Sequence, residues 1–173
     1  MKRLCAVAAF AGVFAAAAAA GDYHGKAQAL MPIPREIGFA QVLQFKPAKK
    51  PAATLARGWQ AGVAAIFAKG TTKAPIEAAA TIYVYTAAAA ARTALQHACP
   101  KCPHVSAKGI EMRVKAGESS GATVVQAFAV CRNVYVSVLT TGPETTMKLA
   151  TDAGTISVAV YRRATHFGMS ACK

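Results

Sequence analysis

Acidic residues are scarce in this chain. Its 173 residues include 7 Asp and Glu against 20 Lys and Arg, which gives a formal net charge of +13. So few carboxylates leave little material for acid–base catalysis by paired acids. The sequence also lacks a phosphate-binding glycine loop and a His-Glu-x-x-His zinc motif. These absences argue against the enzyme classes that depend on such groups.

The first 20 residues have the parts of a secretory signal peptide. Met1-Lys2-Arg3 is basic, residues 4–20 are apolar, and the run ends in three alanines before Gly21-Asp22. The run is mostly alanine and no basic flank follows it, which favours cleavage over a retained membrane anchor. We therefore expect a secreted or periplasmic protein that begins near Gly21, with no transmembrane span after cleavage.

The processed chain remains strongly basic. Without Lys2 and Arg3, 18 basic residues stand against 7 acidic ones, a formal charge of +11. Such a charge attracts anionic polymers and surfaces whatever the fold. The densest basic cluster is Lys46, Lys49 and Lys50, which we take as the candidate anion-binding residues. The partner is expected to be an anionic envelope component or a protein, and no cofactor is indicated.

Four cysteines follow the signal peptide, at Cys99, Cys102, Cys131 and Cys172. An even number of cysteines in an exported protein indicates disulfides, here two. Four cysteines allow three pairings. The order of the expected elements favours a bond between Cys131 and either Cys99 or Cys102.

The first half of the chain predicts a leader, a strand and a helix. Residues 21–35 contain prolines and polar residues and are expected to form a loose leader, with a single domain over residues 36–173. Residues 37–45 alternate as a strand. Over residues 51–69, apolar side chains share one face of a helix that starts near a proline and ends before Gly70; they are Leu55, Trp59, Val63, Ile66 and Phe67.

The second half predicts a strand at residues 76–85, an alanine-rich helix at 87–98 and a three-strand meander at 110–115, 123–131 and 134–140. A last helix is expected to reach residue 163, although residues 155–161 are rich enough in β-branched side chains to form a strand instead. The order β-α-β-α-β-β-β-α predicts an α+β fold, with helices packed on an antiparallel or mixed sheet.

The densest group of metal-binding side chains is His97, Cys99, Cys102 and His104. Their spacing resembles a zinc knuckle that could hold zinc or copper. Disulfides explain the cysteines of an exported chain more simply. A metal-binding envelope protein is therefore the alternative function, and a thiol oxidoreductase is disfavoured because the Cys-x-x-Cys pair follows a helix instead of starting one.

Residues 117–121 match the Gly-x-Ser-x-Gly pattern around a serine nucleophile, and Asp152 and His166 follow Ser119 in the order found in α/β-hydrolases. The flanking segments argue against this site, because the residues after the motif predict a strand where the hydrolases have a helix. A hairpin turn is the simpler interpretation. A small serine hydrolase based on Ser119 is the second alternative.

Three tyrosines on predicted strands, Tyr83, Tyr85 and Tyr135, could form a platform that stacks against bases or sugars, with nearby cations contributing. Aromatic residues on strands more often belong to the core. The platform is therefore a hypothesis that depends on how far these rings are exposed.

The stretch from Gly38 to Arg163 resembles exported bacterial α+β domains of the PsbP/Mog1-like kind and the extracellular sensor domains of mycobacterial serine/threonine kinases. The resemblance rests on Gly58-Trp59-Gln60, on the strand and alanine-rich helix at 81–98, and on residues 124–138 followed by a last helix. It implies the fold and a disulfide between a helix end and a strand. It implies a role in binding and no catalytic residue. We therefore predict an exported, disulfide-stabilised, non-catalytic binding domain.

Overall fold

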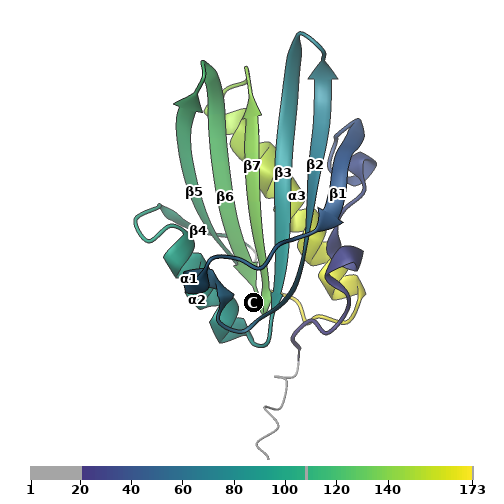
Figure 1. Ribbon diagram of the computed structural model, residues 1–173, viewed down its shortest axis with the longest axis vertical. Coiled ribbons are helices and arrows are strands. Elements are labelled where there is room, and N and C mark those ends of the chain that lie inside the picture. The colour runs from purple at the N-terminus through teal and green to yellow at the C-terminus, as the bar shows by residue number, and fades with distance from the viewer. Residues whose placement is uncertain (1–20, 108, 173) are drawn as a thin grey trace, which may run out of the picture.

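The computed structural model describes residues 21–107 and 109–172, and the expected signal peptide lies outside this part (Figure 1). Its centre is a seven-stranded sheet of order β1-β2-β3-β7-β6-β5-β4, in which every pair is antiparallel. This architecture confirms the α+β prediction. The strands are β1 (Gln41–Pro47), β2 (Trp59–Thr71), β3 (Ala74–Tyr85), β4 (His104–Ala107), β5 (Ile110–Ser119), β6 (Ala122–Cys131) and β7 (Val134–Gly142). The helices are α1 (Ala53–Ala56), α2 (Ala88–Ala98) and α3 (Thr146–His166), with 3-10 turns η1 (Ala27–Leu30) and η2 (Pro34–Glu36).

The two faces of the sheet are covered unequally. The long α3 crosses one face, while α1 and α2 lie over one end of the other (Figure 1). Because side chains alternate along a strand, β6 sends Val125 and Ala127 to the α3 side and Phe128 and Val130 to the α2 side. The rest of the α2 side is not covered by a helix among the described residues, and we call it the open face.

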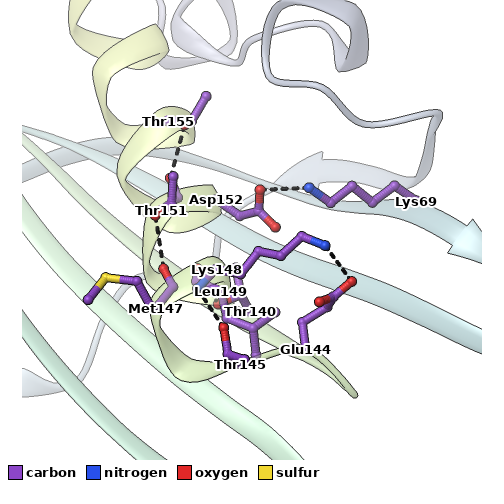
Figure 2. Close-up of polar contacts among 10 residues, drawn as sticks. All are labelled: Lys69, Thr140, Glu144, Thr145, Met147, Lys148, Leu149, Thr151, Asp152 and Thr155. Atoms are coloured by element: carbon purple, nitrogen blue, oxygen red, sulfur yellow. Dashed lines mark hydrogen bonds and ion pairs between the residues drawn. The ribbon is translucent and has the colours of Figure 1, made fainter.

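The last helix settles the ambiguity at residues 155–161 in favour of helix. Thr145 caps α3 by accepting a hydrogen bond from the Lys148 amide at 3.4 Å, and the hydroxyls of Thr151 and Thr155 bond back to carbonyls four residues earlier (Figure 2). The predicted apolar stripe, including Leu149, is buried. Of the described helices, none has both the length and the apolar character that a membrane crossing requires.

The helix predicted at residues 51–69 is wrong. Only α1 is helical there, and β2 begins at Trp59. Val63 and Phe67 are spaced equally well for either structure, but the burial of Ala65 between them shows the alternation of a strand. β2 has strand partners on both sides, β1 and β3, and this pairing overrides the helical spacing.

The segment expected as a loose leader is packed against the core. Its own Tyr23 and Leu30 side chains are buried, and η1 contacts α3. Buried Asn133, in the turn between β6 and β7, accepts from the Tyr23 amide at 2.7 Å and donates to the Tyr23 and Tyr85 carbonyls at 2.8 Å each. One amide side chain thus holds three segments together.

The structure has two disulfides, Cys99–Cys102 and Cys131–Cys172, with Cα atoms 5.4 and 5.6 Å apart. The expected bond between Cys131 and the end of α2 is therefore wrong. The sheet separates those cysteines, because Cys131 belongs to the core on the α3 side while Cys99 packs on the α2 side. Cys172 reaches Cys131 because the tail after α3 returns to the end of β6.

Candidate ligand-binding site on the open face

The pairing register arranges the open face as rows of side chains that run across the strands, since directly paired residues share a face. One row runs across six strands from a basic residue on β1 to a basic residue on β5, and the pairing continues to His104 on β4. It consists of Lys46, Ala64, Thr81, Ser137, Phe128 and Arg113. The next row ends at a second β5 cation and consists of Gln44, Ile66, Ala79, Leu139, Gln126 and Lys115.

A pocket of about 280 Å³ lies where these rows pass beneath α1 and α2. Its lining comes from three layers: the strands form the floor, and single residues of α1 and α2 form the walls. These residues are Leu55, Thr81, Tyr83, Ala98, Lys115, Gln126, Phe128, Tyr135 and Ser137. A second hollow of about 320 Å³ adjoins it and shares Lys115 and Gln126. We call the two hollows together the open-face groove.

The tyrosines predicted as a platform do come together here. Tyr83 stacks on Tyr135 with ring centroids 6.1 Å apart, and Tyr85 meets Tyr135 edge-on at 6.5 Å. Tyr85 and Tyr135 are buried, and the Tyr85 hydroxyl donates to the Leu55 carbonyl at 2.8 Å, so Tyr85 fastens α1 to the sheet. Only Tyr83 keeps a partly exposed surface toward the groove.

These phenols are neutral near pH 7, as an ordinary tyrosine is, and burial extends their neutral range to higher pH. It raises the pKa of Tyr85 to about 12, with a further contribution from Tyr83, and burial also raises the pKa of Tyr83 and of Tyr135. A neutral phenol presents a hydrogen-bond donor and an apolar ring. The floor of the pocket is therefore apolar and uncharged around Tyr83.

The charge of the pocket comes from β5. The Lys115 ammonium lies 5.5 Å from the centroid of the Phe128 ring, and the Gln126 amide donates to the Ser137 hydroxyl at 3.4 Å. None of the described residues that line the 280 Å³ pocket is acidic, whereas Glu118 lines the adjoining hollow. Arg113 is already engaged, since it donates to the carbonyl of Cys99 at 2.7 Å. Lys115 is thus the cation available to a ligand.

The predicted anion-binding lysines lie at the opposite side of the open face. Lys46 is in β1, and the exposed Lys49 and Lys50 follow on the connection that crosses the sheet from β1 to α1 (Figure 1). The Ala48 amide donates to the Gly62 carbonyl at 3.0 Å, and a Cβ at Gly62 would lie 3.0 Å from the Ala48 Cβ and 2.6 Å from a Tyr83 ring carbon. Glycine is thus needed at residue 62 for this crossing.

Two larger hollows lie elsewhere. One of about 540 Å³ is beside the end of α3, where Arg163 already forms a double ion pair with Glu36 through two 2.9 Å bonds. The other, about 460 Å³, adjoins the Cys131–Cys172 disulfide, and its Glu111 pairs with Arg92. Part of their charge is paired internally, and neither has aromatic residues on a sheet floor, so the open-face groove is the better candidate.

The residues of the alternative metal site do not assemble as ligands. Cys99 and Cys102 are joined by a disulfide, and His97 and His104 are exposed on α2 and β4. Over residues 21–107 and 109–172, no group of three or more His, Cys, Asp or Glu side chains could hold a metal ion.

The motif around Ser119 forms the hairpin turn between β5 and β6, where Ser120 and Gly121 adopt positive φ. A strand follows the serine where a nucleophile elbow would have a helix. Asp152 pairs instead with Lys69 at 2.6 Å (Figure 2), and His166 packs against Phe167. The hairpin prediction is confirmed, and Asp152 and His166 are engaged with other residues than Ser119.

The sequence signalled part of the groove. Alternation in residues 110–115 predicted Arg113 and Lys115 on a wet face, and they do lie on the open face. Gln126, Phe128 and Ser137 were not singled out, because their role depends on strand register. Their even spacing on one side of β6 and β7 is the signal that could have identified them.

The fold is similar to that of a solved structure, the extracellular domain of PknH from Mycobacterium tuberculosis. The two chains are 16% identical with a TM-score of 0.57, and the match covers 82% of this chain and 99% of that domain. No protein-family model matches the chain. No curated protein matches it either. The resemblance to PsbP/Mog1-like domains stays a prediction.

Proposed function

We propose that this protein is an exported, non-catalytic binding domain that receives an anionic, chain-like ligand across the open-face groove. The observation that carries the proposal is a pair of adjacent cross-strand rows that begin near Lys46 on β1 and end near Lys115 on β5, with uncharged residues between these two cations. Strands in a sheet are about 4.8 Å apart, so Lys46 on β1 and the β5 cations are roughly 24 Å apart along the sheet. A small anion would touch one end, whereas a chain of acidic units would reach both.

The middle of the groove suits the uncharged parts of such a ligand. Tyr83 offers a ring face and a phenol donor, and Thr81, Ser137 and Gln126 offer hydrogen-bond groups. Aromatic rings with neighbouring polar groups bind the alternating apolar and polar surfaces of sugars. We therefore favour an acidic polysaccharide of the cell envelope as the ligand class.

Export is supported by three features. The first 20 residues have the pattern of a signal peptide, four cysteines form two disulfides, and the fold resembles that of an extracellular domain. Disulfides persist in oxidising compartments, which agrees with a secreted or periplasmic location. We propose that cleavage before Gly21 leaves a single domain with this groove as its binding site.

Ligand binding can be followed with the single tryptophan of the chain. Trp59 packs against the cluster beneath α1 and α2, next to the pocket floor. Titrating the processed protein with an oligogalacturonate should change Trp59 fluorescence, and a neutral maltooligosaccharide of equal length should not. Higher salt should weaken the binding, because exposed charges are screened.

Two single-charge variants distinguish binding in the groove from attraction by the net charge of the protein. Lys115→Gln should weaken oligogalacturonate binding at least about tenfold, the scale of one hydrogen bond to a charged group. Lys26→Gln is the matched control, because Lys26 is exposed before η1, which packs on the α3 side. Equal weakening by both variants would show attraction by net charge alone and would refute the groove as the site.

A further inference from the structure

We propose that β1 is a docking edge, at which an extended segment of a partner protein with alternating acidic and apolar residues adds a strand to the sheet. This surface overlaps the open-face groove only at Lys46. It consists of the outer backbone groups of β1 and of the side chains on both sides of that strand.

The outer side of β1 has no strand partner among the described residues, since β1 ends the sheet order and pairs only with β2. All seven residues of the strand are exposed. About half of the backbone N–H and C=O groups of an edge strand point away from its single neighbour. These groups are the donors and acceptors that an added strand uses.

Exposed apolar side chains make this edge unusual. Val42, Leu43 and Phe45 are 41%, 51% and 52% exposed. Val42 pairs with Phe67 and Phe45 with Ala65, so both extend the apolar surface of the α3 side past the rim of the core. An apolar residue of the added strand would cover each of them and remove that surface from water.

The other side of the same strand is polar and basic. Gln44 and Lys46 face the open side, and Lys49 and Lys50 follow directly. From residue 37 to residue 76 the sequence contains no Asp or Glu and six Lys or Arg. An added strand whose residues alternate would therefore place apolar side chains beside Val42 and Phe45 and acidic ones beside Lys46.

Charge also selects against a second copy of this chain as the occupant. Lys46, Pro47 and the bulge between Val42 and Gln44 are features that discourage edge-to-edge pairing of identical strands. Two copies would bring together like-charged edges. An acidic segment meets the same lysines favourably, and Pro47, which lacks an N–H, limits the ladder to residues 41–46.

The test uses a fluorescent peptide that alternates valine and glutamate, titrated with the processed protein and followed by anisotropy. A peptide of the same composition, with its valines and glutamates in two blocks, is the control for charge. We expect saturable binding of the alternating peptide that weakens with salt and exceeds that of the block peptide. Equal binding of both peptides, or of neither, would overturn the proposal.

Two pairs of variants locate the site. Phe45→Ser should weaken binding of the alternating peptide at least about fivefold, because the bound peptide would cover the apolar surface of the Phe45 ring. Phe167→Ser, a matched change at a ring 50% exposed, should leave the affinity unchanged. Replacing Lys46, Lys49 and Lys50 with Gln should weaken binding of the alternating peptide. Lys115→Gln, which tests the groove, should leave that binding unchanged.

Hydrogen exchange locates the bound peptide on the unaltered protein, so the result does not depend on whether a variant folds correctly. A bound peptide should protect amides of residues 41–46 that exchange freely in the unbound protein. Protection confined to the groove strands β5 and β6 would place the peptide in the groove and would refute docking at β1, while leaving the proposed function intact.

Discussion

Removing the two disulfides separately should have very different effects on stability. The Cys131–Cys172 bond closes a loop with a sequence separation of 41, whereas Cys99–Cys102 spans a separation of 3. In the chain-entropy treatment, these loops correspond to about 4 and about 1.6 kcal/mol of stabilisation at 25 °C. Cys131 is also buried, so its replacement by alanine leaves a small cavity that adds to the loss.

The assay is urea unfolding of the double variants Cys131→Ala/Cys172→Ala and Cys99→Ala/Cys102→Ala beside the parent. We expect the first to lose about 2 kcal/mol more than the second, with similar denaturant slopes. The reverse order of losses would refute the reasoning. It would mean that local support of the α2 end, where Arg113 bonds the Cys99 carbonyl, matters more than closure of the long loop.

Three other predictions concern pH and packing. The Arg163 guanidinium lowers the pKa of Glu36 below 4.5, so this ion pair stabilises the fold above pH 4.5 and its contribution is lost as the pH falls through the lowered pKa. The Glu36→Gln variant should therefore be less stable than the parent near pH 7. In urea unfolding at acid pH, the difference in unfolding free energy between the two proteins should become smaller. Burial raises the pKa of Tyr85 to about 12 from 10.0, so stability should fall as the pH rises above 10, and near-ultraviolet absorbance should show tyrosine ionisation coinciding with unfolding. Gly62→Ala should lower the free energy of unfolding by about 1–3 kcal/mol, because the added Cβ would lie 2.6 Å from a ring carbon of Tyr83. Gly154→Ala in α3, where the added Cβ meets open space, should raise it by about 0.5–1 kcal/mol. Thermal unfolding of both variants beside the parent measures the two changes.

The fold class, the helix at α2 and the meander of β5, β6 and β7 followed from local patterns. Residues 110–115 alternate because one side of the strand faces the α3 core and the other lies on the open face. The segment at residues 51–69 failed because alanine-rich sequence satisfies both periods: Val63 and Phe67 are four apart, and both also fit a strand. The segment is a strand because it pairs with β1 and β3, and the sequence of the segment alone does not predict that pairing.

The groove and the cysteine pairing depend on which side of the sheet each residue faces. The sequence could indicate that Lys46 and Lys115 are basic and on strands. It could not show that rows from β1 to β5 run between them, because β7 lies beside β3 only after the chain has turned back from β6. The same limit explains the disulfide error, since two cysteines near each other in element order lie on opposite faces.

The amide of Asn133 has a consequence for the order in which the chain matures. Tyr23 lies among the first described residues, yet its partner Asn133 is 110 positions later, and the bond to Cys172 closes at the opposite end of the chain. A chain that crosses a membrane from its amino end would deliver the Tyr23 segment first and leave it without its partner until β6 and β7 have emerged. During export the Tyr23 segment would stay accessible to chaperones and proteases. It would pack against the rest of the domain only late in folding, about when the Cys131–Cys172 disulfide forms.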